Sequence, residues 1–383
     1  MIFCGELYFC VGYIVGVMGD IRNSKITRVS IVGILTNVCL ASFKAVVGLM
    51  AHSIAVILDA VNNLSDALSS VITIVGVKLA GRKPDREHPF GHGRVEYFTA
   101  IVISALVFAA GVTSFVESVK KIIKPEASDY SWITVLVITV AIVTKLILGR
   151  YVKKRGIELN SDALVASGAD ASFDAILSAA TLLAAAISMI WGVNVDGYIG
   201  AVISGFIVKA GIELLLDPMS RVVGKRAQSD LSRAIKSEIA NVDGVTGVFD
   251  LILHDYGPSI AIGSVHVEVA DDISAVDVHR ITRRIQNLVY DKFKIVLTVG
   301  IYAKNGSDSQ VMEMESFARK TALAHEGVMQ LHGFLVDEGL ITFDVVIAFK
   351  YDQAAICAEI SEAIQSNYPG YSLSINVDTD YSD

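Results

Sequence analysis

The chain has 383 residues, of which 53% are hydrophobic and 19% are charged, and its formal net charge is −8. This apolar share excludes an ordinary soluble enzyme, and no basic tract with interleaved aromatic residues supports binding to nucleic acid. The long apolar runs end near residue 216. We therefore expect a membrane domain followed by a soluble region.

The membrane domain is predicted to hold six helices, each near the roughly 20 residues that a bilayer requires. We expect these spans at about 29–50, 54–79, 96–120, 131–149, 162–191 and 195–216. Residues 1–28 are predicted to form an N-terminal cytoplasmic segment, and residues 29–216 the six-helix domain. The first 17 residues are interpreted as an extension or an interfacial segment. They lack the basic region and cleavage site of a signal peptide.

Basic residues predict how the spans are oriented. They lie before the first span, between the second and third, between the fourth and fifth, and after the sixth. The opposite side carries only Lys120, Lys121 and Lys124. The positive-inside rule then puts both termini in the cytoplasm. We expect an integral protein of the cytoplasmic (plasma) membrane, in contact with its lipids.

Two of the predicted spans carry a pair of oxygen side chains one helical turn apart. The pairs are Asn62 with Asp66 in the second span and Asp170 with Asp174 in the fifth. Each pair shares one helix face, about 6 Å apart along the axis. A carboxylate at membrane depth is costly unless it is paired, hydrated or bound to a cation. If the two helices meet, these oxygens form a site for a divalent metal, so metal transport is the leading hypothesis.

The types of ligand in this predicted site bear on the metal. The site has no histidine and no cysteine. Oxygen ligands suit Mn²⁺, Mg²⁺ or Ca²⁺ better than Zn²⁺ or Cu⁺. Ligand hardness alone does not choose among the harder ions.

The loop after the second span, GRKPDREHPFGHGRVEYF, is the next dense cluster of polar residues. Asp85, His88 and His92 lie at positions i, i+3 and i+7, with acidic residues nearby. This spacing fits either a peripheral metal site or a polar turn with solvated charges. We predict a metal site and keep the turn as the alternative.

The soluble region is predicted to contain two similar modules. Residues 217–303 read as helix, strand, strand, helix, strand, and residues 304–383 repeat this order. We expect two tandem cytoplasmic α+β modules of ferredoxin-like type. No G-x-S-x-G, P-loop or H-E-x-x-H motif occurs, so the chain is not predicted to be an enzyme. His325 and His332, with the acidic residues Asp337 and Glu338, are interpreted as structural residues and not as a ligand group.

The segment HPFGHGR, the segment DAVNNLSDALSS and the six spans resemble the cation diffusion facilitator family of divalent-metal transporters. The similarity covers about residues 22–303. Carried over to this chain, the family's transport site falls on Asn62, Asp66, Asp170 and Asp174. Zinc-type members usually place a histidine in the fifth span, where Asp170 stands here. The combination looks like the manganese-type branch.

The resemblance implies a function and a mode of assembly. The chain is expected to export divalent metal, with Mn²⁺ favoured, from the cytoplasm by alternating access in exchange for protons, without a cofactor. Homodimers are expected to form through the cytoplasmic modules. Two further sites are implied by zinc-type members. One is the loop set Asp85, His88 and His92, and the other is a regulatory set of His254, His266 and His279.

Two other readings remain open at this point. A zinc or iron exporter of the same family would use the same fold. A membrane-anchored metal sensor would instead use the soluble modules as its active part, and would carry no flux through the spans.

Overall fold

A computed structural model describes residues 3–50, 54–124, 132–191, 196–258, 261–304, 306 and 308–378. The chain divides into two compact units. One holds residues 1–225 and 256–259, and the other holds residues 226–255 and 260–383. The first unit carries the long apolar helices, and the second carries all the strands.

Among its described residues, the first unit contains six helices that are long and apolar enough to cross a membrane, as predicted. They are α1 (Phe3–Met50), α2 (Ile54–Ala80), α3 (Val95–Ile123), α4 (Trp132–Glu158), α5 (Asp162–Trp191) and α6 (Asp196–Val223). The first candidate span, Ile21–Val47, lies inside α1. Residues 3–20 therefore continue the same helix toward the N-terminus.

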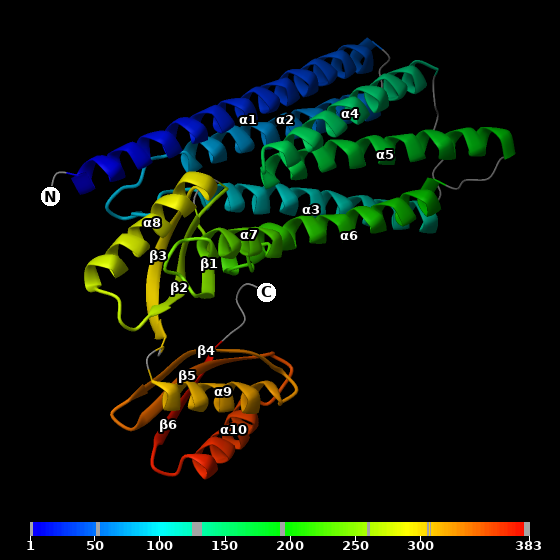
Figure 1. Cartoon of the computed structure of the whole chain (residues 1–383). Helices are drawn as coiled ribbons and strands as arrows, with labels where there is room; N and C mark the ends of the chain where they lie inside the picture. Colours follow the sequence, from blue (N-terminus) through cyan, green and yellow to red (C-terminus); the bar gives the residue numbers. More distant parts are fainter. Residues whose placement is uncertain are drawn as a thin grey trace. The chain divides into compact units, whose positions relative to one another are not determined.

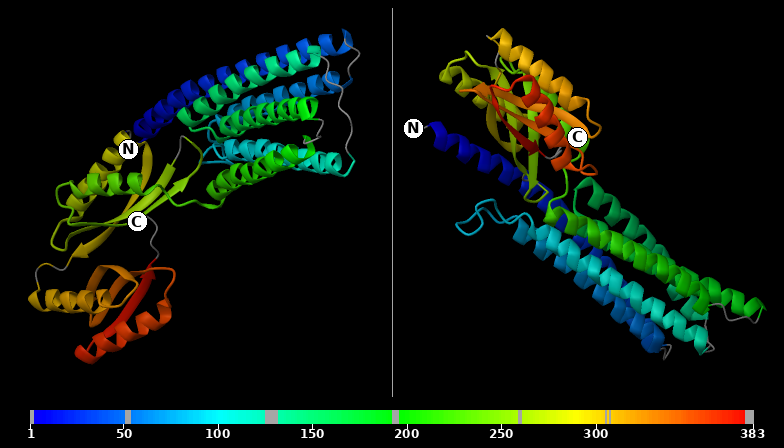
Figure 2. Two further views of the ribbon diagram at one scale, coloured as in Figure 1. Left: turned by 90° about the vertical axis from the view of Figure 1, so that its right-hand side faces the viewer. Right: turned by 90° about the horizontal axis from the view of Figure 1, so that it is seen from below.

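The helices pack as antiparallel neighbours, and Figures 1 and 2 show them running alongside one another. The most extensive contacts join α1 with α2, α3 with α6, and α4 with α5, and α2 also contacts α5. Glycines bring α4 and α5 especially close. A Cβ atom on Gly149 would lie 2.4 Å from Oγ of Ser172, and one on Gly168 would lie 2.4 Å from the backbone nitrogen of Lys153. Small residues at helix contacts are how membrane helices approach closely.

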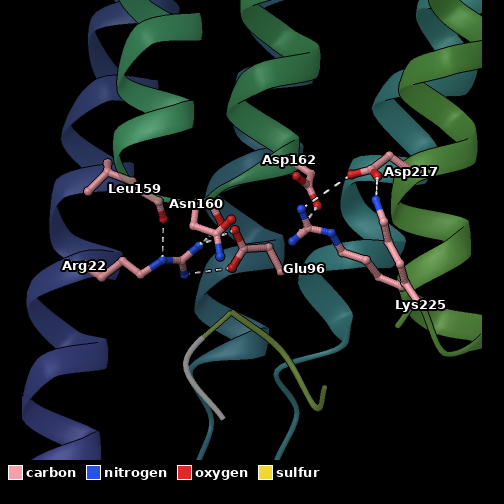
Figure 3. Close-up of polar contacts among 8 residues, drawn as sticks. Arg22, Glu96, Leu159, Asn160, Asp162, Asp217 and Lys225 are labelled. Atoms are coloured by element: carbon pink, nitrogen blue, oxygen red, sulfur yellow. Dashed lines mark hydrogen bonds and ion pairs between the residues drawn. The ribbon is translucent and has the colours of Figure 1, made fainter. Parts of the chain in front are cut away.

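A buried ion pair lies at the end of the bundle at which α4 connects to α5 (Figure 3). Arg22 of α1 donates two hydrogen bonds of 2.8 Å to the carboxylate of Glu96 on α3. The same guanidinium donates to the carbonyl oxygens of Leu159 (2.7 Å) and Asn160 (2.9 Å) in the α4–α5 turn. Glu96 is only 1% exposed, so its charge depends on this paired geometry. Glu96, which lies near the loop cluster in sequence, is thus a structural residue.

The second unit contains two modules with the predicted order of elements. The first has α7 (Ser229–Ala240), β1 (Gly247–Asp255), β2 (Ala261–Ala270), α8 (Ala275–Phe293) and β3 (Ile295–Lys304). The second has α9 (Ser309–Leu323), β4 (Val328–Asp337), β5 (Leu340–Ile347), α10 (Gln353–Asn367) and β6 (Ser372–Asp378). In each sheet the first two strands are antiparallel, and the crossover helix makes the third strand parallel to the second. The predicted fold class is confirmed.

Each module buries one face of its sheet beneath its two helices. Alternate strand residues such as Val265 and Val267, or Phe343 and Val345, are at most 1% exposed and form the cores. The helices of a module contact each other as well as the sheet, so they cover the same face. Because side chains alternate along a strand, the intervening residues project from the face without helices.

Candidate metal site

Two carboxylates on different helices of the membrane domain hold one buried cation, the side chain of Lys145. Nζ of Lys145, on α4, lies 2.8 Å from Oδ2 of Asp66 on α2 and 2.5 Å from Oδ2 of Asp174 on α5. Lys145 is 4% exposed. An ammonium at such depth is costly unless it is paired, and here it bonds to both acids. The polar faces of α2 and α5 therefore approach each other on either side of a positive charge.

The third predicted acid belongs to the same polar region. Asp170 lines a small cavity together with Asp66, and it is within electrostatic range of Asp66, Asp174 and Lys145. The cavity measures about 10 Å³, close to the smallest space that holds one water molecule. Polar atoms from α1, α2 and α5 complete its lining: Ser30, Asn37, Ser70 and Ser167. Hydroxyl and amide oxygens could serve a partly hydrated cation here.

Asn62, the fourth predicted ligand, is placed differently from the three acids. It lies one turn before Asp66 on α2 and is exposed, whereas its neighbour Asn63 is fully buried. Among the described residues, neither polar atom of the Asn63 side chain has a hydrogen-bond partner. The structure thus brings three of the four predicted residues together, and Asn62 stays a prediction.

Lys145 is the site residue that sequence reasoning missed. The predicted fourth span contains this lysine, in the sequence AIVTKLILGR. The first span holds Lys44, also buried, in ASFKAVV. A lysine inside an apolar span signals a buried partner, because an unpaired charge in the bilayer is costly. That signal was available in the sequence.

The structure brings the three predicted loop residues together. The rings of His88 and His92 lie 4.5 Å apart between centroids, and each has a nitrogen within 3.4 Å of a carboxylate oxygen of Asp85. Asp85 also accepts backbone hydrogen bonds from Glu87 (3.0 Å) and His88 (2.7 Å), which close a turn. These bonds, chiefly the one from His88, lower the pKa of the exposed Asp85 carboxyl. This geometry is compatible with both interpretations of the loop, a polar turn and a peripheral metal site.

The three histidines proposed as a regulatory set do not form one cluster. His254 is at the end of β1 and is paired with Ile262, whereas His266 lies four residues further along β2. Four residues of strand are about 13 Å. His279 is exposed on α8. The hairpin register separates the two strand histidines, so the three residues do not share one site within the described chain, and their regulatory role stays a prediction.

His266 instead belongs to a carboxylate cluster. Its Nδ1 lies 2.8 Å from Oδ2 of Asp250. This hydrogen bond, which outweighs the effect of burial, raises the pKa of His266. Asp344 and Asp378 face the ring as well and raise its pKa further, and the ring of Tyr302 packs 4.7 Å away.

The raised pKa of His266 predicts a pH-dependent contribution to stability. A raised folded-state pKa stabilises fully below the unfolded value of about 6.5, and the contribution is lost as the pH rises through the folded value. We expect His266→Gln to lower the unfolding temperature of the detergent-solubilised chain more at about pH 6 than at about pH 9. Thermal unfolding of both proteins across this range is the measurement. An equal difference at every pH would contradict the assignment of the proton to this pair.

The described part of the chain contains six apolar helices with buried acids between them, followed by an α+β region, which is the arrangement of an integral membrane protein. Residues 30–221 match the cation efflux transmembrane domain, and residues 227–301 match the cytoplasmic domain of cation efflux proteins. The chain belongs to the cation efflux family, the cation diffusion facilitators. Members of this family are transporters, and the chain is therefore not an enzyme.

Several curated relatives align over most of their length. An uncharacterized transporter of Methanocaldococcus jannaschii is 31% identical over 263 residues, covering 69% of this chain and 93% of the relative. The manganese efflux system protein MneP of Bacillus subtilis is 24% identical, covering 74% of this chain and 98% of that protein. MneS, a second manganese efflux system protein of the same bacterium, is 26% identical, covering 70% and 91%.

Proposed function

We propose that the chain exports Mn²⁺ from the cytoplasm, and that Asn62, Asp66, Asp170 and Asp174 bind the ion during transport. The observation that carries this proposal is the ammonium of Lys145, bonded to Asp66 at 2.8 Å and to Asp174 at 2.5 Å. A site that already holds a cation between α2 and α5 has the charge and the approach of helices that a metal requires. The metal is the cargo of this site.

The chemistry of the site supports an exchange of metal for protons. A carboxylate must be deprotonated to bind a metal, so protons and metal compete for the same oxygens. Lys145 is a third competitor, because its ammonium bonds to oxygens that the metal would need. In such a cycle, the site would bind metal from one side of the membrane and release it to the other. Protons or the ammonium of Lys145 would then occupy the carboxylates until the protein returned to its first state.

Two independent arguments favour Mn²⁺ as the cargo. The four proposed ligands are all oxygen atoms, which suit Mn²⁺ better than Zn²⁺. The relatives MneP and MneS are named manganese efflux system proteins. Zn²⁺ and Fe²⁺ are the alternative cargoes that a transport assay has to separate.

The proposal also includes location and assembly. The distribution of lysine and arginine supports cytoplasmic termini and a plasma-membrane protein that exports its cargo. The name given to the matched cytoplasmic domain refers to a dimer, which supports a homodimer formed through the cytoplasmic region.

Reconstituted transport tests this function. The purified full chain is placed in liposomes that carry a pH gradient, and the entry of Mn²⁺, Zn²⁺, Fe²⁺ and Cd²⁺ is followed with the internal pH. We expect Mn²⁺ to be transported fastest and to move protons in the opposite direction. Tight metal binding without flux of any of the ions would instead support the membrane-anchored sensor.

The selectivity can be changed by adding a nitrogen ligand. We expect Asn62→His or Asp170→His to shift the ratio of Zn²⁺ to Mn²⁺ transport toward Zn²⁺ by at least about tenfold, because imidazole favours the softer ion. The ratio is measured in the same liposomes with both ions present. An unchanged ratio in both variants would remove the ligand assignment as the basis of selectivity.

A further inference from the structure

The two cytoplasmic modules meet through the sheet faces that their helices leave uncovered. In the first module, Phe249, His266 and Tyr302 alternate with core residues and so lie on this face. In the second module, His332 and Asp344 lie on the corresponding face. Residues of the two faces contact each other: Oη of Tyr302 lies 2.8 Å from Oδ2 of Asp344, and the ring of Phe249 stacks on that of His332. We call this contact the module joint.

The module joint has approximate two-fold symmetry. Phe249 pairs with His266 just before the irregularity in β1, and His332 pairs with Asp344 just before the second of two irregularities in β4. Phe249 and His332 are thus equivalent positions, and their rings stack with centroids 5.0 Å apart and planes inclined by 11°.

The bulges that follow these two residues are equivalent as well. Asp250 comes after Phe249 with a φ of +52°, and Gly333 comes after His332 with a φ of +63°. Contact between equivalent residues is the property of an isologous interface. The joint is therefore a matched surface built from the same part of each module.

The equivalent positions of the two modules carry chemically different side chains, and this difference creates a polar cluster. Where the first module has Phe249, the second has His332, which is 1% exposed. Nε2 of His332 lies 2.9 Å from Oδ1 of Asp250, 3.7 Å from Oδ2 of Asp378 and 4.0 Å from Oδ2 of Asp344. Among the described residues, neither ring nitrogen of His332 has a hydrogen-bond partner of good geometry. A buried imidazole nitrogen is thus surrounded by carboxylate oxygens without bonding to them through a proton.

These distances fit ligands that share one metal ion. Two ligand atoms that are each about 2.1 Å from a metal lie roughly 3 to 4 Å apart. One donor atom each from Asp250, His332 and Asp378 lie within 4.8 Å of one another. Three carboxylates around one imidazole also leave excess negative charge, which a divalent cation would balance.

The surroundings of Asp250 orient its carboxylate toward such an ion. Its Oδ2 accepts from His266 at 2.8 Å and lies 2.9 Å from Oη of Tyr302, while its Oδ1 faces His332. Burial alone would raise the pKa of Asp250, but the hydrogen bond from His266 and the electrostatic effect of the His332 ring hold it well below its ordinary value. Asn376 donates at 2.8 Å to Asp344 in the same way. Hydrogen bonds that fix ligating carboxylates are the usual support of a metal site.

We propose that the module joint binds a divalent first-row transition metal through Asp250, His332 and Asp378. The mixed set of one imidazole and several carboxylates suits Mn²⁺, Fe²⁺ or Zn²⁺. Metal bound there ties the second module to the first, because its ligands come from both. The site lies outside the membrane domain and does not depend on the transport proposal.

Pulsed electron paramagnetic resonance of bound Mn²⁺ tests the site in the full chain. The proposed transport ligands are all oxygen atoms, so nitrogen coupling to Mn²⁺ reports an imidazole ligand. The parent protein carries His88→Gln and His92→Gln, which remove the loop imidazoles. We expect nitrogen coupling in the parent, loss of that coupling and of about one bound Mn²⁺ in His332→Phe, and at least about tenfold weaker binding in Asp378→Asn. Phenylalanine reproduces the equivalent residue of the first module.

The control is His325→Gln, which changes another histidine of the second module that lies 3.4 Å from Glu359. It should keep both the coupling and the bound metal. Absence of nitrogen coupling in the parent, or its persistence in His332→Phe, would overturn the proposal. If His332→Phe does not fold, the near-isosteric variant Asp378→Asn tests the proposal instead. Unchanged Mn²⁺ affinity in Asp378→Asn would also overturn the proposed site. Transport activity of these proteins is a separate measurement and does not affect the outcome.

Discussion

Replacement of Asp66, Asp170 or Asp174 by asparagine is expected to reduce Mn²⁺ efflux by on the order of a hundredfold or more. Asparagine keeps the size of the side chain but removes the negative charge that would bind a divalent ion and the group that, in the proposed mechanism, exchanges metal for protons. The measurement is the initial rate of Mn²⁺ entry into liposomes that contain equal amounts of each protein. Proton movement, recorded in the same experiment, should fall with the metal flux.

A matched control separates this effect from a general loss of folded protein. Glu117→Gln removes a carboxylate of α3 that is exposed and paired with Lys120 at 2.8 Å. It should transport Mn²⁺ at the rate of the unmodified protein. Rapid transport by any one of the three aspartate variants would show that its carboxylate is not required, and the proposed site would have to be abandoned.

Replacement of Lys145 by methionine is expected to tighten Mn²⁺ binding and to slow transport. In the proposed transport site, the ammonium would compete with the metal for the oxygens of Asp66 and Asp174, to which it is now bonded. The attraction between unit charges about 3 Å apart is roughly 5 kcal/mol at an effective dielectric constant near 20. Removing even part of this competition, about 1.4 kcal/mol, corresponds to a tenfold change in affinity. Titration with Mn²⁺ and the turnover rate in liposomes are the two measurements.

The same variant should be less stable without metal, because its buried acids lose their positive partner. Added Mn²⁺ should restore the unfolding temperature, since a ligand of the folded state stabilises it. Lys154→Met, which changes an exposed lysine of the same helix, serves as the control. Unchanged Mn²⁺ affinity in Lys145→Met would mean that the ammonium and the metal do not occupy the same place.

The fold and part of the site followed from patterns that simple physics makes visible. Long apolar runs predicted the six helices. The order of helical segments and of strands with alternating apolar and polar residues predicted the two modules. The one-turn spacing of Asp170 and Asp174 placed both acids on one helix face. Partners from other helices were harder to find. Lys145 is 29 residues from Asp174 and 79 from Asp66 in sequence, and only packing of α4 against α5 brings it to them.

The cytoplasmic histidines show the opposite error. Resemblance grouped His254, His266 and His279, but strand register separates the first two. His332 was read as structural because its sequence neighbours offer no ligand set. Its neighbours in space, Asp250 and Asp378, come from a bulge in one module and the last strand of the other. A contact between repeated modules cannot be seen in either repeat alone.

The repeated module has a further consequence for self-association. In the structure, strands of the second module cover the sheet face that the helices of the first module leave open. Because the two modules belong to one chain, dilution of the protein does not weaken their contact, and a second chain competes for the same face at a disadvantage. Two copies of the protein would then have to associate through other surfaces. The affinity of that dimer would be independent of the affinity between the two modules of one chain.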